Sequence, residues 1–322
     1  MRARRDVGIR PEPRLSVTLR ALNIMRPQGR ACLVGMAMVA SCACWVSISA
    51  APQAPPDVES LMTRIGERVA GYHRQSQRVL FIESSTVQPI ASNWMPAGLA
   101  RTVESELRIE SDPADGALLP AAKVVRDIRR INGRPPREGD THSRAGCTDP
   151  NPLSPEPLAF LLPAHRAEYR FTSVRQGKDN SRAALVIDFV SANRDSRPVL
   201  IEDERGHDDC FDWSGPLATS GRLWVDPNTY DVLRVDRRVD GVVDVRVPVT
   251  LQRRHGFGAS VVLERDDLTM RYKAVTFSDP DEVIRLPESI ESITVLRGGL
   301  QSVRRTETFS EYRRFLGKGR VK

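Results

Sequence analysis

The stretch GRLWVDPNTYDVLRVD, residues 221–236, has the pattern of two β-strands joined by a tight turn. Residues 226–229, Asp-Pro-Asn-Thr, are residue types that favour turns. On the return strand, Leu233 and Val235 alternate with charged residues, so one face is apolar and the other polar. We therefore predict a hairpin of an antiparallel sheet, in which Asp226 forms the turn and is not an acid catalyst.

Alternating runs continue on both sides of this hairpin. Residues 101–111 and 264–277 each place apolar side chains on one face and charged side chains on the other. The apolar side chains of interest on these faces are Leu107, Ile109, Leu268, Met270 and Tyr272. Other strand-like runs are residues 78–87, 123–131, 168–174 and 182–192, and Gly298-Gly299 marks a second hairpin. Consecutive strands with short connections indicate an antiparallel meander.

Two segments have helical patterns. Asp57 is a typical N-cap residue, and an apolar stripe from Val58 to Tyr72 follows it at helical spacing. Residues 154–162 form a short, very apolar helix that Pro163 is expected to end. The predicted fold is mainly β (α+β): a curved antiparallel half-barrel sheet covered by an N-terminal amphipathic helix and a short apolar helix.

The net charge of +7 belongs to the beginning of the chain. Eight arginines against two acidic residues in residues 1–50 account for six of these charges. The rest of the chain has no basic run interleaved with aromatic residues, so we predict no nucleic-acid partner.

Residues 1–50 have the features of a signal peptide, and Met25 is an alternative start. Arg26 and Arg30 precede an uncharged apolar span, residues 31–50, and a Pro/Ala linker follows at residues 51–56. Two alternatives remain open: residues 31–50 as an uncleaved membrane anchor, and lipidation at Cys42 within the sequence VASC. All three place the body in the periplasm or cell envelope, where it touches a membrane only through this leader.

Outside the leader there are two cysteines, Cys147 and Cys210. In an oxidising compartment a single pair of this kind predicts a disulfide. The alternative is a zinc site in which His142 and His207 complete a tetrahedral set with the two cysteines.

The motifs of common enzymes are absent from the sequence. There is no G-x-S-x-G, Walker or H-E-x-x-H motif, so we predict a protein that is not an enzyme and uses no cofactor. The alternative is a hydrolase that uses the acidic loop 202–213, with Asp208, Asp209 and Asp212 as candidates for the acid and base.

The sequence LWVDPNTYDVLRVD, with FSEYRRF near the C-terminus, resembles the LolA/LolB-like lipoprotein-carrier family of the bacterial periplasm. The resemblance implies a single domain over residues 57–316, an open half-barrel with helices over its mouth, followed by a basic tail at residues 317–322. It also implies a concave face that binds acyl chains or another hydrophobic ligand.

Two functions follow from these expectations. The first is an exported, non-enzymatic protein that binds a lipid or other hydrophobic ligand in the cell envelope. Its ligand-binding residues would be Leu107, Ile109, Leu268, Met270 and Tyr272, and methionine suits a surface that adapts to varied chains. The alternative is an envelope scaffolding domain in which the same residues fill an ordinary core and the partner is an envelope protein.

Overall fold

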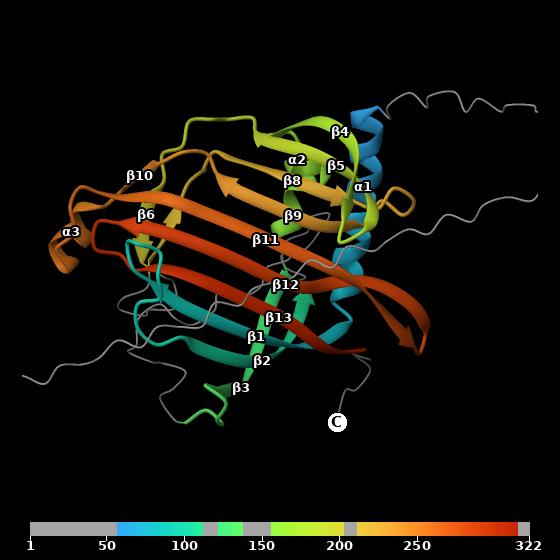
Figure 1. Cartoon of the computed structure of the whole chain (residues 1–322), viewed down its shortest axis with the longest axis horizontal. Coiled ribbons are helices and arrows are strands. Elements are labelled where there is room, and N and C mark those ends of the chain that lie inside the picture. The colour runs from blue at the N-terminus through green and yellow to red at the C-terminus, as the bar shows by residue number, and fades with distance from the viewer. Residues whose placement is uncertain (1–56, 112–121, 138–155, 203–210, 315–322) are drawn as a thin grey trace, which may run out of the picture. The chain divides into compact units, whose positions relative to one another are not determined.

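The computed structural model describes residues 57–111, 122–137, 156–202 and 211–314. These residues all belong to one compact unit, Ala54–Lys322, and Figure 1 shows their arrangement. Within these ranges, no helix combines the length and the apolar character that a membrane span requires.

Several expectations concern residues outside these ranges. They are the leader 1–50 with its alternatives at residues 31–50 and Cys42, the linker 51–56, the tail 317–322, and the disulfide or zinc residues His142, Cys147, His207 and Cys210. These remain predictions.

Thirteen strands of the described residues form one sheet. The main path runs β3-β2-β1-β13-β12-β11-β9-β8-β5-β4, and every neighbouring pair on it is antiparallel. The strands of this path are β1 (Val79–Ile90), β2 (Arg101–Ser111), β3 (Ala122–Ile131), β4 (Tyr169–Asp179), β5 (Arg182–Ser191), β8 (Thr219–Val225), β9 (Val232–Val239), β11 (Ser260–Ser278), β12 (Asp281–Arg297) and β13 (Ser302–Arg314).

The sheet is open, because β3 and β4 lie at its two ends and do not pair with each other. Three short strands lie beside this path: β10 (Val243–Arg246) pairs with β11, β6 (Val199–Glu202) with β10, and β7 (Phe211–Ser214) with β6. The predicted mainly β fold with an open antiparallel sheet is confirmed.

The hairpin that residues 221–236 predict is formed by β8 and β9, with Leu223 opposite Val235. The Asp226 carboxylate accepts hydrogen bonds from the backbone amides of Asn228 at 2.9 Å and Thr229 at 3.1 Å. Asp226 therefore closes the turn, as expected.

The helices are α1 (Val58–Ser76), η3 (Glu156–Leu161, a 3₁₀ helix), α2 (Pro163–Arg166) and α3 (Val249–His255). Asp57 caps α1 by accepting a hydrogen bond from the Ser60 amide at 3.2 Å. The short apolar helix η3 ends at Leu161, before Pro163 as expected, and Pro163 then begins the separate helix α2. Proline is favoured at the first position of a helix, where its missing N–H would have no partner.

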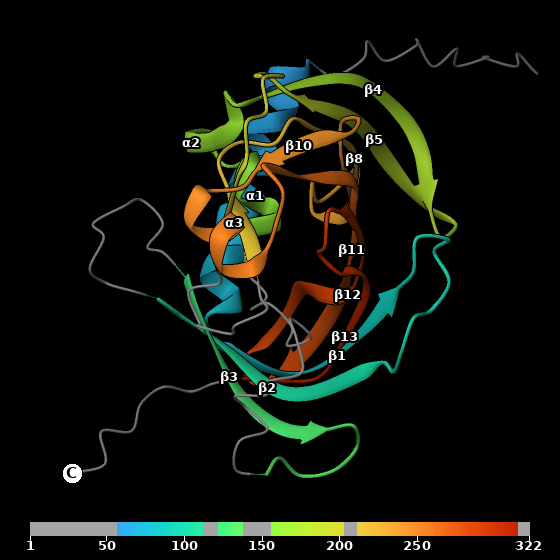
Figure 2. The same cartoon turned by 90° about the vertical axis from the view of Figure 1, so that its left-hand side faces the viewer.

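The sheet curves around α1, as Figure 2 shows. We call the face toward α1 the helix side and the opposite face the outer side. On the helix side, the stripe of α1 packs against apolar side chains of the strands and of η3 in one main cluster. The buried side chains of the stripe are Leu61, Met62, Ile65, Val69 and Tyr72. A second, smaller cluster gathers near α3 around Leu251 and Leu263.

Candidate functional site

The residues predicted to bind a ligand lie mainly in the cluster beneath α1. Leu107, Met270 and Tyr272 are buried members of the main cluster, and Leu268 packs against it while partly exposed. Ile109 is buried on the same strand as Leu107. The structure thus brings four of the five predicted residues together, and their role in binding stays a prediction.

The space between α1 and the sheet is filled. Tyr72 of α1 meets Tyr272 of β11 edge to face, with ring centroids 5.9 Å apart. A hole beside these rings, next to Leu158 and Val232, has a volume of about 20 Å³. A hole of this size has room for about one water molecule. A hydrophobic ligand would therefore have to displace α1 or side chains beneath it.

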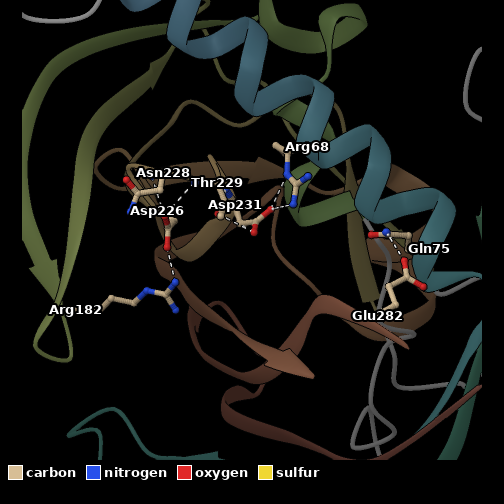
Figure 3. Close-up of polar contacts among 8 residues, drawn as sticks. All are labelled: Arg68, Gln75, Arg182, Asp226, Asn228, Thr229, Asp231 and Glu282. Carbon is tan, nitrogen blue, oxygen red and sulfur yellow. Dashed lines mark hydrogen bonds and ion pairs between the residues drawn. The ribbon is translucent and has the colours of Figure 1, made fainter. Parts of the chain in front are cut away.

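Polar contacts attach the flanks of α1 to the sheet (Figure 3). Arg68 donates to the Asp231 carboxylate at 2.8 Å, and the Gln75 amide donates to Glu282 at 2.8 Å. The Arg68 side chain is 53% exposed, and exposed ion pairs of this kind contribute at most about 1 kcal/mol. We call these two contacts the latch.

The turn of the β8–β9 hairpin lies between α1 and the β4–β5 hairpin. Asp231 at its end pairs with Arg68, and Asp226 at its start pairs with Arg182 at the beginning of β5 (Figure 3). Burial alone would raise the pKa of the Asp226 carboxyl. The hydrogen bonds from the Asn228 and Thr229 amides and from Arg182 outweigh it and hold that pKa below its usual value. Asp226 is thus held ionised, as a structural carboxylate.

A groove of about 350 Å³ lies between the N-terminal half of α1, α2 and the edge strand β4. Its apolar lining includes Met62 of α1 and two partly exposed aromatic side chains of β4, Tyr169 and Phe171. All three also belong to the main cluster or pack against it. The groove therefore borders the main apolar cluster at the surface, beside the first turns of α1, and we call it the mouth groove.

An ion pair lies beside this groove. Arg166 of α2 donates to the Glu59 carboxylate at 2.6 Å and to the Thr63 hydroxyl at 3.3 Å, both on α1. These contacts join α2 to the first turns of α1, at the end of the helix where the mouth groove opens.

Two buried acidic residues were missed by the sequence analysis. Glu83 on β1 is 0% exposed and Glu307 on β13 is 3% exposed. Both occupy positions of their strands where the alternation predicts an apolar residue. Glu83 lies on the same face of β1 as Phe81, and Glu307 lies on the same face of β13 as Phe309. A carboxylate at an apolar position of an alternating strand is the sequence signal that could have identified these two residues.

The acidic loop 202–213 is described only at its ends. Glu202 pairs with Arg254 at 2.5 Å and with His255 at 3.3 Å, and Asp212 accepts a hydrogen bond from the Trp213 amide. Asp208 and Asp209 lie outside the described residues. In the parts of the chain that the structure describes, no group of three or more His, Cys, Asp or Glu could hold a metal ion.

No protein-family model matches the chain, and no curated protein matches it. Among solved structures it is similar to an outer membrane lipoprotein-sorting protein domain from Vibrio parahaemolyticus, at 12% identity over 82% of this chain and 96% of that one, with a TM-score of 0.38. It is also similar to a DUF1329 family protein from Desulfovibrio piger, at 10% identity over 81% and 95%, with a TM-score of 0.39. A third is a LolA superfamily protein from Nitrosomonas europaea, at 10% identity over 78% and 92%, with a TM-score of 0.29. Likenesses of this degree assign no function to the chain.

Proposed function

We propose that this chain is an exported, non-enzymatic protein of the periplasm or cell envelope that binds a hydrophobic ligand, such as the acyl chain of a lipid, between α1 and the sheet. The observation that carries the proposal is the mouth groove. It is lined by Met62, Tyr169 and Phe171, and these side chains belong to the main apolar cluster or pack against it. Export is supported by the sequence of residues 1–50.

Binding requires α1 to move, because the space beneath it is filled. The five buried side chains of its stripe would lose about 10 kcal/mol if all were exposed to water. An acyl chain of about twelve carbons recovers about 9 kcal/mol at about 0.8 kcal/mol for each buried methylene. The free energy lost by exposing the stripe is therefore close to the free energy gained by burying the acyl chain. The loss is smaller if only the part of α1 at the mouth groove moves away from the sheet.

The polar contacts of α1 fit such a movement. The latch contacts Arg68–Asp231 and Gln75–Glu282 lie at the surface or only partly buried, so water replaces them when they open. The apolar stripe then supplies most of the free energy that holds α1 closed. A ligand that replaces this apolar contact competes directly with the helix.

The test is binding of a fluorescent dodecanoic acid analogue to the purified mature protein. We expect saturable binding that unlabelled dodecanoate displaces, and at least a tenfold loss of affinity for Phe171→Glu, which places a charge in the mouth groove. Phe171 is only partly buried, so the variant should remain folded.

The matched control is Gln176→Glu. It adds the same charge to an exposed position of the same strand β4, outside the groove. Unchanged affinity is expected for this variant. Wild-type protein that binds no probe, or two variants that lose affinity equally, would contradict the proposal.

A second candidate function is supported by the filled core. Because the hole beside Tyr72 and Tyr272 has a volume of only about 20 Å³, the domain is also compatible with an envelope scaffold whose partner is a protein. In that case the chain binds no acyl probe, and crosslinking in cells gives one specific protein adduct. The probe experiment therefore separates the two functions.

A further inference from the structure

A group of buried polar side chains lies on the helix side of the sheet, directly beside the main apolar cluster. It consists of Glu83 and Ser85 on β1, Ser105 on β2, Arg126 on β3 and Glu307 on β13, and we call it the buried polar cluster. Ser85 lies opposite Glu307 in the strand register, and Ser105 lies opposite Glu83. Four strands thus direct polar groups to one place on an otherwise apolar face.

The two carboxyl groups are compensated unequally. Arg126 donates to both oxygens of Glu83, at 2.7 Å each. Two basic groups act on Glu307: Arg305, at 3.9 Å, and Arg126, which is already bonded to Glu83. A buried carboxylate needs close partners to remain ionised, so Glu307 is the less stabilised of the two.

The Ser105 hydroxyl has no hydrogen-bond partner among the residues that the structure describes. Ser105 is 0% exposed. A buried hydroxyl of this kind is costly unless a ligand or water supplies the missing hydrogen bond. Because Ser105 lies opposite Glu83, its hydroxyl is directed into the buried polar cluster.

The cluster adjoins the place proposed for the acyl chain. Phe81 is two residues before Glu83 on the same face of β1, a distance of about 7 Å along the strand. Phe81 packs edge to face on Phe309 with centroids 5.6 Å apart, and both rings belong to the main cluster. A molecule whose tail lies beneath α1 can therefore place its polar end among Glu83, Ser105 and Glu307.

The groups that surround Glu307 set its charge. Burial, together with the neighbouring Glu83 carboxylate, raises the pKa of Glu307 to about 7, although Arg305, Arg126 and Ser85 act in the opposite direction. From the adjacent β12, Ile290 lies opposite Glu307 and carries no charge. A cation placed here would favour the ionised carboxylate.

We propose that the buried polar cluster binds the head group of an amphiphile that bears a primary ammonium group. This rests on the proposed function, since the tail of the same molecule occupies the space beneath α1. The cluster offers acceptors, the Glu307 carboxylate and the Ser105 hydroxyl, to a group with three N–H donors and a positive charge. An anionic head would instead face two carboxyl groups.

The test compares probes of equal tail length by calorimetry at about pH 8, where Glu307 is mostly ionised. The probes are dodecylamine, dodecyltrimethylammonium, which has the charge but no N–H, and dodecanoate; butylamine has the amine without the tail. We expect dodecylamine to bind at least tenfold more tightly than the other three.

Two variants assign the preference to the cluster. Glu307→Gln should abolish the advantage of dodecylamine over dodecyltrimethylammonium, and Ser105→Ala should reduce it about threefold. Ser105→Ala removes a hydroxyl without a hydrogen-bond partner among the described residues, so folding is preserved. Glu291→Gln, an exposed glutamate on the outer side of β12, is the matched control and should change nothing.

The outcomes separate this inference from the proposed function. Equal binding of the three long-chain probes, or an amine preference that survives Glu307→Gln and Ser105→Ala, would overturn the head-group inference and leave the proposed function standing. Butylamine binding as tightly as dodecylamine would overturn the amphiphile as the ligand. If no probe binds, both fail.

Discussion

Replacing Glu307 with glutamine should make the protein more stable at alkaline pH. Burial, with the neighbouring Glu83 carboxylate, raises the pKa of this carboxyl from its ordinary value of 4.5 to about 7 in the folded state. At pH values between these two, Glu307 is mostly protonated in the folded chain and mostly ionised in the unfolded chain. Stability is therefore greatest below the unfolded pKa and falls as pH rises through the folded one.

The size of the effect follows from the two pKa values. A shift from 4.5 to about 7 corresponds to about 3 kcal/mol of lost stability at pH well above both. Most of this loss should occur between about pH 5 and about pH 8. Glutamine has nearly the same shape and never ionises, so the variant should not show this loss.

The measurement is urea unfolding of the wild type, Glu307→Gln and the exposed control Glu291→Gln at several pH values in this range. The quantity of interest is the free energy of unfolding of each variant minus that of the wild type, because titrating groups that do not interact with Glu307 cancel in the difference. This difference should rise with pH for Glu307→Gln and stay flat for Glu291→Gln. A flat difference for both variants would refute the reasoning that Glu307 is buried with too little compensating charge.

Further changes test the turn, the sheet and the latch. Gly221→Ala should destabilise the protein by about 3 kcal/mol, because a Cβ there would lie 2.1 Å from the Asp236 carbonyl oxygen and 2.4 Å from the Phe189 ring. The control is Gly258→Ala, whose Cβ would lie 3.8 Å from the nearest atom. This variant should unfold at the same urea concentration as the wild type. Asp226→Ala removes the acceptor of two amide hydrogen bonds and should cost about 1–3 kcal/mol near neutral pH. The pKa of Asp226 is lowered in the folded state, so the stability that its carboxylate contributes should be lost as the pH falls through that pKa. The free energies of unfolding of the wild type and of Asp226→Ala should therefore converge at low pH. Arg68→Ala should change stability by less than about 1 kcal/mol yet speed dissociation of a bound fluorescent fatty acid in stopped-flow measurements, whereas an unchanged rate would argue against a latch.

The sheet could be predicted from sequence because its information is local. Alternation with period two shows which residues share a face, and the Asp-Pro-Asn-Thr turn fixes the register of β8 and β9. The same holds for α1, where Asp57 and the stripe from Val58 to Tyr72 mark both its start and its buried face.

Contacts between distant segments could not be predicted in this way. The partner of Glu83 is Arg126, 43 positions away on β3, and the neighbour of Glu307 on β1 is Ser85. The residues next to Glu83 and Glu307 in the sequence do not indicate these partners. The charges on apolar positions were visible in the sequence, but only the strand order β3-β2-β1-β13 shows that they meet.

The hairpin 221–236 shows how one local element can serve the proposed movement of α1. Its turn is rigid, because the Asp226 carboxylate is buried and bound by two amides of the turn and by Arg182. The last residue of the turn, Asp231, instead contacts α1 through the exposed side chain of Arg68. A rigid support next to a weak contact lets α1 detach from the turn without disturbing the sheet. The opening that the proposed function requires is therefore localised in the latch and the apolar stripe, and the hairpin remains fixed while α1 moves.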